Sequence, residues 1–290
     1  MTTTREPNAP RPPAPPPFRM AAVQMDVRLG DRRGNLERIG ELARRAAGSG
    51  ARLVVFPECA LTGYCFESID EAREHAEEVP GNATAALEPL CRELGIHIVF
   101  GLLERDGDRT FNALALVGPQ GFAGGYRKVH LPHLGVDHFV TPGDRPFAVH
   151  DTPLCRLGMN ICYDGAFPEA ARLMALAGAD LIVLPTNWPS GAEEFAIYGI
   201  NTRALENNVY YASVDRVGAE RGFRFIGLSR IVDPHGRTLA EADGSSEAIL
   251  LATVDPSIAR RKRIDRVPGK HWIDRIADRR PELYGPLADR

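Results

Sequence analysis

The stretch LGMNICYDGAFPEAAR, residues 157–172, decides the fold class because it joins two kinds of secondary structure. The apolar run LGMNI is typical of a buried strand, the Cys-Tyr-Asp that follows is typical of a turn, and the rest has the spacing of a helix. A strand, a tight turn and a helix in this order form the basic unit of α/β proteins. Cys162 lies at the turn, where a free cysteine is more often a small packing residue than a nucleophile. Both alternatives stay open on this stretch alone.

The same alternation extends over both halves of the chain. The run ARLVVFPE (51–58) is continuously apolar, as expected for a strand that is buried on both faces. The other expected strands are 20–25, 97–105, 112–118, 155–162, 179–187, 209–218, 229–233 and 248–255, and the expected helices are 35–48, 83–94, 167–176 and 193–207. Some strands follow one another directly, across turn residues such as 106–109. The pattern therefore predicts an α/β fold with mixed sheets.

The composition is that of an ordinary globular protein, with 290 residues, 44% hydrophobic and 25% charged. No break in composition separates residues 18 and 265, so we predict one domain over this range. Residues 1–17 are rich in proline and threonine and lack an apolar core, which predicts a disordered leader rather than a signal peptide. The arginine-rich segment 266–290 is expected to form an arm that contacts the surface or a partner subunit.

Charge and cysteine usage exclude several classes of protein. The net charge of −3 gives no overall basic field for nucleic acid or a membrane surface, and the basic run 260–263 is short. No apolar run reaches the roughly 20 residues that a membrane helix needs. The five cysteines (59, 65, 91, 155 and 162) form no CxxC pair, which argues against zinc and disulfides and favours the cytoplasm.

Three chemically useful side chains lie at strand ends: Glu58 after VVFP, Lys128 after AGGYR and Cys162 after GMNI. The carboxyl ends of strands in α/β sheets open onto the crevice where ligands bind, so these side chains can converge. A nucleophilic thiol needs a base and a polar environment, for which Glu58 and Lys128 are suited; Lys128 would lower the pKa of the thiol. Each residue alone has an ordinary reading as a packing, capping or surface residue.

The three local sequences together resemble the nitrilase superfamily of carbon–nitrogen hydrolases. They are Phe-Pro-Glu (56–58), Tyr-Arg-Lys-Val-His-Leu (126–131) and Ile-Cys-Tyr-Asp with Phe-Pro-Glu-Ala-Ala-Arg (161–172), separated by about 70 and 34 residues. The similarity continues through 203–207, 215–218, 227–229 and 233–236, and covers residues 18–285. It implies an αββα sandwich that pairs into an αββααββα homodimer or a higher homo-oligomer.

The resemblance also implies roles for the three residues. Glu58 would be the general base, Cys162 the nucleophile, and Lys128, with the backbone N–H of Tyr163, would stabilise the tetrahedral intermediate. No metal or organic cofactor is implied. Many members carry a second acid after the lysine motif, usually Glu. This chain has Asp137 there, one methylene shorter, so Asp137 is either a fourth site residue or a turn residue.

Three further residues are candidates for the walls of a substrate pocket: Tyr64 after Glu58, and Asn187 and Trp188 after the strand 179–187. His130, His133 and His138 form a cluster in which a metal site is the alternative to loop packing; in the family pattern His130 belongs to the lysine motif. We expect loop packing rather than metal ligation.

The predicted reaction is hydrolysis of a small amide with release of ammonia. The Cys-Tyr-Asp form of the nucleophile motif resembles amidase-type members more than nitrilases. Hydrolysis of a nitrile or of an N-carbamoyl amide is the alternative within the same chemistry. A catalytically silent scaffold is the alternative from another class of protein, although a scaffold has no need of Glu58, Lys128 and Cys162 together.

Overall fold

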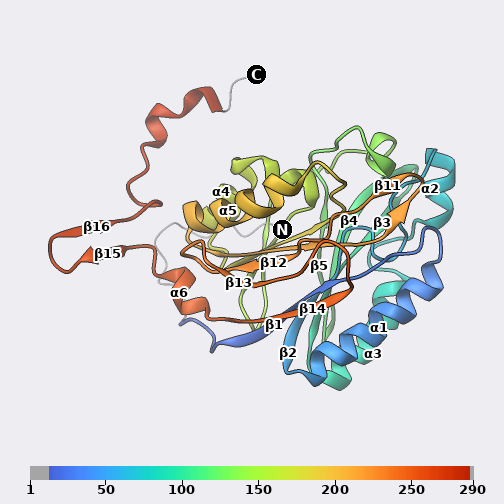
Figure 1. Ribbon diagram of the computed structural model, residues 1–290, viewed down its shortest axis with the longest axis horizontal. Coiled ribbons are helices and arrows are strands. Elements are labelled where there is room, and N and C mark those ends of the chain that lie inside the picture. Colours follow the sequence, from blue (N-terminus) through green and yellow to red (C-terminus); the bar gives the residue numbers. More distant parts are fainter. Residues whose placement is uncertain (1–12, 288–290) are drawn as a thin grey trace.

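The computed structural model describes residues 13–287 and shows two six-stranded mixed sheets packed face to face, with helices on their outer faces (Figure 1). The first sheet has the order β14 (Ala248–Val254), β1 (Phe18–Gln24), β2 (Ala51–Val55), β3 (His97–Asp106), β4 (Arg109–Gly118) and β5 (Gly121–Arg127). The second has the order β13 (Thr238–Glu241), β12 (Arg230–Val232), β9 (Tyr210–Asp215), β8 (Leu181–Thr186), β7 (Arg156–Met159) and β6 (Val149–Asp151).

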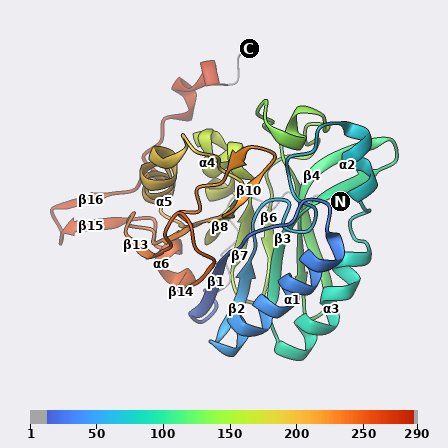
Figure 2. The same cartoon turned by 45° about the vertical axis from the view of Figure 1, so that its right-hand side comes forward.

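Each sheet has a parallel centre and antiparallel edges. Strands β1, β2 and β3 are parallel to one another, as are β7, β8 and β9, while the remaining neighbours in both sheets are antiparallel. The parallel strands are connected by helices that lie on the outer faces (Figure 2). These helices are α1 (Arg32–Gly48) and α3 (Asn82–Leu94) on the first sheet, and α4 (Pro168–Leu176) and α5 (Ile200–Asn207) on the second.

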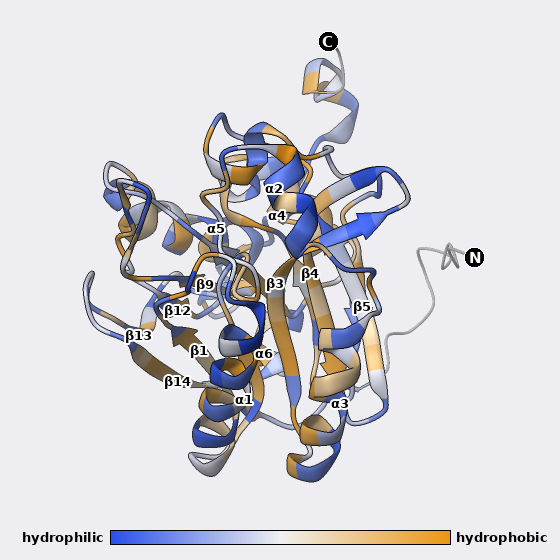
Figure 3. Cartoon of the chain, turned by 90° about the vertical axis from the view of Figure 1, so that its right-hand side faces the viewer, coloured by the Kyte–Doolittle hydropathy of each residue, from blue (hydrophilic) through white to orange (hydrophobic). Residues whose placement is uncertain are grey.

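The period-two alternation of β1 explains why the sandwich forms. Met20 and Ala22 belong to the apolar cluster between the two sheets, while Ala21 and Val23 pack in the cluster with α1, which includes Ile39. Both faces of the central strands are therefore buried, which explains their continuous apolar sequences (Figure 3). The predicted αββα arrangement with mixed sheets is confirmed.

Several element boundaries differ from the predicted ones. The strand expected at 155–162 ends at Met159, because the backbone N–H of Ile161 turns to the carboxylate of Asp164 (3.0 Å). The helix expected at 193–207 begins with a π-helical turn, Phe195–Gly199, before α5. Helix α1 begins three residues early because Asp31 caps it, accepting the N–H of Gly34 (2.9 Å).

Short elements complete the structure. They are α2 (Ile69–His75), α6 (Pro256–Arg260), the hairpins β10 (Ala219–Glu220) with β11 (Phe223–Arg224) and β15 (Ile264–Val267) with β16 (His271–Ile273), and the 3₁₀ turns Gly135–His138, Cys162–Ala166, Pro281–Leu283 and Gly285–Leu287. None of these was predicted as a separate element. No described helix has the length and apolarity needed to cross a bilayer.

The two terminal segments meet the predictions differently. Residues 1–12 of the predicted leader lie outside the described residues, and 13–17 carry no regular secondary structure. The predicted start of the C-terminal arm, residue 266, falls inside β15. The β15–β16 hairpin and the segment after it extend away from the sandwich (Figure 1). Large apolar side chains on this arm are exposed, including Trp272, Leu283 and Leu287.

Candidate active site

Glu58, Lys128 and Cys162 are buried where the strands that precede them end. Glu58 lies in the loop after β2, Lys128 follows β5 directly, and Cys162 opens the 3₁₀ turn after β7. The Lys128 Nζ atom lies 2.6 Å from Glu58 Oε1, and both charges act on the Cys162 thiol. The convergence predicted from the strand ends is therefore present.

Asp137 completes the charged cluster. Its carboxylate pairs with the Lys128 ammonium, so one lysine sits between two carboxylates. Asn112 links the same two acids, because its amide nitrogen donates to Glu58 Oε1 (2.7 Å) and to Asp137 Oδ1 (2.8 Å). Asn112 was not singled out from the sequence; its place as the polar first residue of the apolar run NALALVG was the available signal.

Glu58 is suited to move a proton near neutral pH. Burial raises its pKa to about 6 from an ordinary 4.5; the charge of Lys128 opposes this rise, and the charge of Asp137 adds to it. Its second oxygen, Oε2, is buried and has no hydrogen-bond partner within residues 13–287. One oxygen is thus fixed by Lys128 and Asn112, while the other remains available to accept a proton.

The thiol and the lysine differ in their resting charge. Burial, followed by the negative charge of Glu58, raises the pKa of Cys162 well above its ordinary value, while Lys128 lowers it. Burial also lowers the pKa of Lys128, but the carboxylates of Asp137 and Glu58 outweigh burial and hold this pKa well above its usual range. Lys128 does act on the thiol in the predicted direction, but Cys162 still rests as a neutral thiol that needs a base.

The backbone at Cys162 adopts a left-handed conformation with φ of 45°, which is uncommon for a residue other than glycine and marks a tight turn. Asp164 holds this turn against the lysine segment. Its carboxylate accepts hydrogen bonds from the Tyr126 hydroxyl (2.7 Å), from the backbone N–H of His130 (2.9 Å) and from Ile161 N. Asp164 thereby fixes the position of the nucleophile turn relative to the segment that carries Lys128.

The expected pocket residues occupy different settings. The Tyr64 hydroxyl donates to Asp137 Oδ2 (2.7 Å), so its polar end is engaged by the charged cluster. Asn187 is buried, and neither polar atom of its amide has a partner among the described residues. Trp188 is buried against Phe195, whereas Tyr163 is 42% exposed.

The three histidines do not converge. His130 Nδ1 lies 2.8 Å from Asp164, whereas His133 and His138 pack against each other. Within residues 13–287 no group of three or more His, Cys, Asp or Glu side chains is arranged to hold a metal ion.

The sequence of this chain matches the model of the carbon–nitrogen hydrolase family over residues 19–263. The chain belongs to the carbon–nitrogen hydrolase family. A curated relative, a nitrilase of Pyrococcus abyssi, is 40% identical over 267 residues, which are 92% of this chain and 98% of that protein. The omega-amidase NIT2 of Homo sapiens is 33% identical over 251 residues, covering 82% of this chain and 88% of the relative.

The fold of this carbon–nitrogen hydrolase also matches a solved relative. An amidase from Nesterenkonia sp. superposes with a TM-score of 0.77 at 26% identity, covering 93% of this chain and 96% of the amidase. These comparisons show an enzyme of the nitrilase superfamily that hydrolyses carbon–nitrogen bonds.

Proposed function

We propose that this carbon–nitrogen hydrolase is an amidase that releases ammonia from a small amide through a thioester on Cys162. The observation that carries the proposal is the buried Glu58–Lys128 pair beside a neutral thiol, with one Glu58 oxygen free to accept a proton. A solved structure of a mutant Nesterenkonia amidase has the acetamide moiety of fluoroacetamide covalently added at its active-site cysteine, which supports a cysteine nucleophile here.

The first step forms the bond between sulfur and carbon. Glu58, ionised above its pKa of about 6, takes the thiol proton as the sulfur attacks the amide carbonyl carbon. Negative charge then develops on the carbonyl oxygen. The Lys128 ammonium and the backbone N–H of Tyr163 stabilise this charge, and one preorganised donor of this kind contributes about 3 kcal/mol.

The second step breaks the bond between carbon and nitrogen. Glu58 returns its proton to the nitrogen, ammonia leaves, and the acyl group remains on Cys162 as a thioester. Glu58 then accepts a proton from water as the water attacks the thioester carbon, and it gives that proton to the departing sulfur. The sum is amide plus water to carboxylic acid plus ammonia, with the enzyme unchanged.

We assign substrate contacts to Asn187 and Trp188, which directly follow β8, and the backbone of Asn187 lies at the Cys162 thiol. The unpaired amide of Asn187 is suited to hydrogen-bond a polar group of the substrate, because a buried amide without a partner is costly. Trp188, packed edge-on against Phe195 with ring centres 5.6 Å apart, supplies an apolar wall. Asp137 holds Lys128, and we propose it as the functional counterpart of the second acid of the family despite its shorter side chain.

Nitrile hydrolysis is the second candidate, because the relative from Pyrococcus abyssi with 40% identity is named a nitrilase. The same residues serve it: the sulfur adds to the nitrile carbon, the nitrogen takes protons through Glu58, and two waters yield the acid and ammonia. N-carbamoyl amides differ only in the group attached to the carbonyl and belong in the same test.

Ammonia release from short aliphatic and aromatic amides, matched nitriles and N-carbamoyl amino acids separates these candidates. We expect amides to be turned over fastest, and Cys162→Ala to be inactive on all substrates. Absence of turnover across the whole panel, with no difference between wild type and Cys162→Ala, would support the silent scaffold instead.

We also propose that the enzyme forms a homodimer or larger homo-oligomer in the cytoplasm, with the segment 266–290 contacting a partner subunit. Helices α4 and α5 expose Leu173, Leu176 and Leu205 on one outer face, which supports a protein partner there. The five cysteines are all free and buried, which fits a reducing compartment.

A further inference from the structure

A second buried ion pair, Arg216–Glu220, lies outside the group of residues that react. Both side chains are almost fully enclosed: Arg216 is 0% exposed and Glu220 is 3% exposed. Burying two charges is costly unless their remaining hydrogen bonds are satisfied. The remaining hydrogen bonds of the Glu220 carboxylate are made with a loop next to the active site.

Glu220 holds the loop that carries Tyr64. Its Oε2 atom accepts the backbone N–H of Tyr64 (3.0 Å) and of Cys65 (2.9 Å), while its other oxygen pairs with Arg216. The preceding Gly63 has φ of 79°, and a Cβ atom there would lie 2.6 Å from the Leu29 backbone and 3.1 Å from Glu220 Oε1. The loop therefore approaches the glutamate as closely as glycine permits.

Tyr64 in turn binds the 3₁₀ turn that carries Asp137. Its backbone carbonyl accepts the N–H of Val136 (2.8 Å), and its hydroxyl lies within hydrogen-bond distance of the Leu134 carbonyl (3.0 Å) and Asp137 Oδ2 (2.7 Å). At Gly135 a Cβ atom would lie 2.6 Å from the Tyr64 ring, so the turn packs directly on the ring. Asp137 then pairs with Lys128.

We propose that the Arg216–Glu220 pair positions Lys128 for catalysis, acting through the Tyr64 loop and Asp137. Glu220 is a positioning residue in this assignment, because it touches none of the reacting groups itself. The proposal rests on the proposed function, in which Lys128 stabilises the oxyanion. The geometry of Lys128 then depends on residues 216–220, which follow β9 of the second sheet and lie far from Lys128 in sequence.

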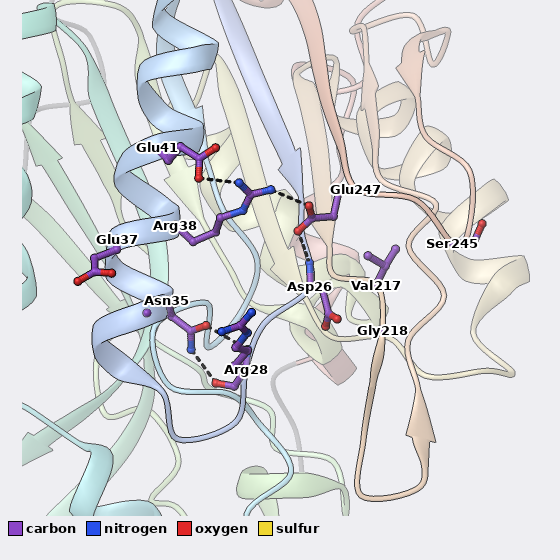
Figure 4. A pocket seen from close by; sticks show the side chains of 11 residues that line it. Asp26, Arg28, Asn35, Glu37, Arg38, Glu41, Val217, Gly218, Ser245 and Glu247 are labelled. Atoms are coloured by element: carbon purple, nitrogen blue, oxygen red, sulfur yellow. Dashed lines mark hydrogen bonds and ion pairs between the residues drawn. The ribbon is translucent and has the colours of Figure 1, made fainter.

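Arg216 anchors the ion pair to the segment that follows β1. Its guanidinium donates to the Val27 carbonyl (2.6 Å) and to Asp26 (3.0 Å), and it lies over the Phe225 ring at 4.3 Å. Asp26 lies two residues after the end of β1 and lines a polar surface groove of about 740 Å³ together with Arg38 and Glu247 (Figure 4). The pair thus ties the first sheet to the active-site loop at one end of the sandwich.

The expected effect of releasing Glu220 follows from the charges around Lys128. If the Tyr64 hydroxyl moves off Asp137, this carboxylate loses a donor and draws the shared Lys128 ammonium more strongly. The contact of Lys128 with Glu58 then weakens, which raises the pKa of Glu58, because Lys128 lowers it in the intact site. A misplaced Lys128 also stabilises the oxyanion less well, so the loss falls on kcat.

The test compares Glu220→Gln with Glu77→Gln in the full-length enzyme. Glu77 is a matched control, since it is buried, pairs with Arg32 and accepts a backbone N–H (Ala83, 2.8 Å), and within residues 13–287 its side chain has no hydrogen bond or ion pair with an active-site residue. We expect both variants to lose thermal stability. Only Glu220→Gln should lose kcat, by about 10- to 100-fold with KM changed less than about threefold, and shift the acid limb of the pH profile upward.

A double-mutant cycle with Tyr64→Phe tests the route of the effect. If Glu220 acts through the tyrosine hydroxyl, Glu220→Gln should cause little further loss of kcat in the Tyr64→Phe background, and Glu220→Asp should recover part of the activity. The proposal would be overturned if the losses of kcat in Glu220→Gln and Tyr64→Phe were additive in the double variant. It would also be overturned if Glu220→Gln had the same kcat and the same acid limb as Glu77→Gln. If Glu220→Gln does not fold, Tyr64→Phe is measured alone, and an acid limb of its pH profile equal to that of the wild type overturns the proposal. Failure of the proposed function looks different: the wild type itself would be inactive.

Discussion

Acidification provides a quantitative test of Glu58 as the general base. Burial raises the pKa of Glu58 from 4.5 to about 6, a shift that disfavours its ionised form by about 2 kcal/mol. Only the ionised form accepts the thiol proton, so activity requires a pH above this value. At pH 5 about one Glu58 in ten is ionised, which predicts a kcat/KM about tenfold below the plateau; an ordinary glutamate would lose only about a quarter of its activity.

The assay measures ammonia release from an uncharged amide between pH 4.5 and 8.5 at constant ionic strength. Circular dichroism at each pH, and recovery of activity on return to pH 7.5, show that the protein stays folded. Asp137→Asn should move the acid limb down, because the negative charge of Asp137 raises the pKa of Glu58. An acid limb near pH 4.5 in the folded wild type, or an upward shift in Asp137→Asn, would refute the reasoning.

Two further predictions concern Lys128 and the oligomer. Lys128→Met should lower kcat by about 100-fold or more in the ammonia assay, since it removes an oxyanion donor. Substitution of the exposed Lys270 by Met should leave kcat unchanged. Equal kcat values in the two variants would show that Lys128 takes no part in the mechanism. Leu173→Arg on α4, a side chain 51% exposed, should shift the sedimentation coefficient from oligomer to monomer, whereas Leu239→Arg on β13, 43% exposed, should not. A monomeric wild type contradicts the proposed homodimer.

The parts of the fold that were predictable are those in which local pattern and tertiary burial agree. Residues 51–58 are apolar throughout because β2 is covered on both faces, and helix α3, expected at 83–94, spans Asn82–Leu94. The strand ends also indicated where Glu58, Lys128 and Cys162 would meet. The family resemblance then supplied their roles, which neither spacing nor burial determines.

The missed features depend on contacts between residues that are distant in sequence. Asn112 looks like an ordinary polar residue at the start of the expected strand 112–118 until Glu58 and Asp137 are placed around its amide. Glu220 lies in a polar stretch typical of a surface turn, and only the fold brings it to the N–H groups of Tyr64 and Cys65. The early end of β7 has the same origin, because Asp164 competes for the Ile161 N–H with the sheet.

The most direct test of the account is to detect the acyl group on Cys162. Wild-type enzyme is mixed with a saturating short amide, quenched in acid during steady-state turnover, and measured by intact-protein and peptide mass spectrometry. We predict a mass increase equal to the acyl group less the thiol hydrogen that it replaces, located on the peptide that contains Cys162 and absent from Cys162→Ala, which should release no ammonia. An adduct on another residue, or ammonia release that continues in Cys162→Ala, would contradict the account.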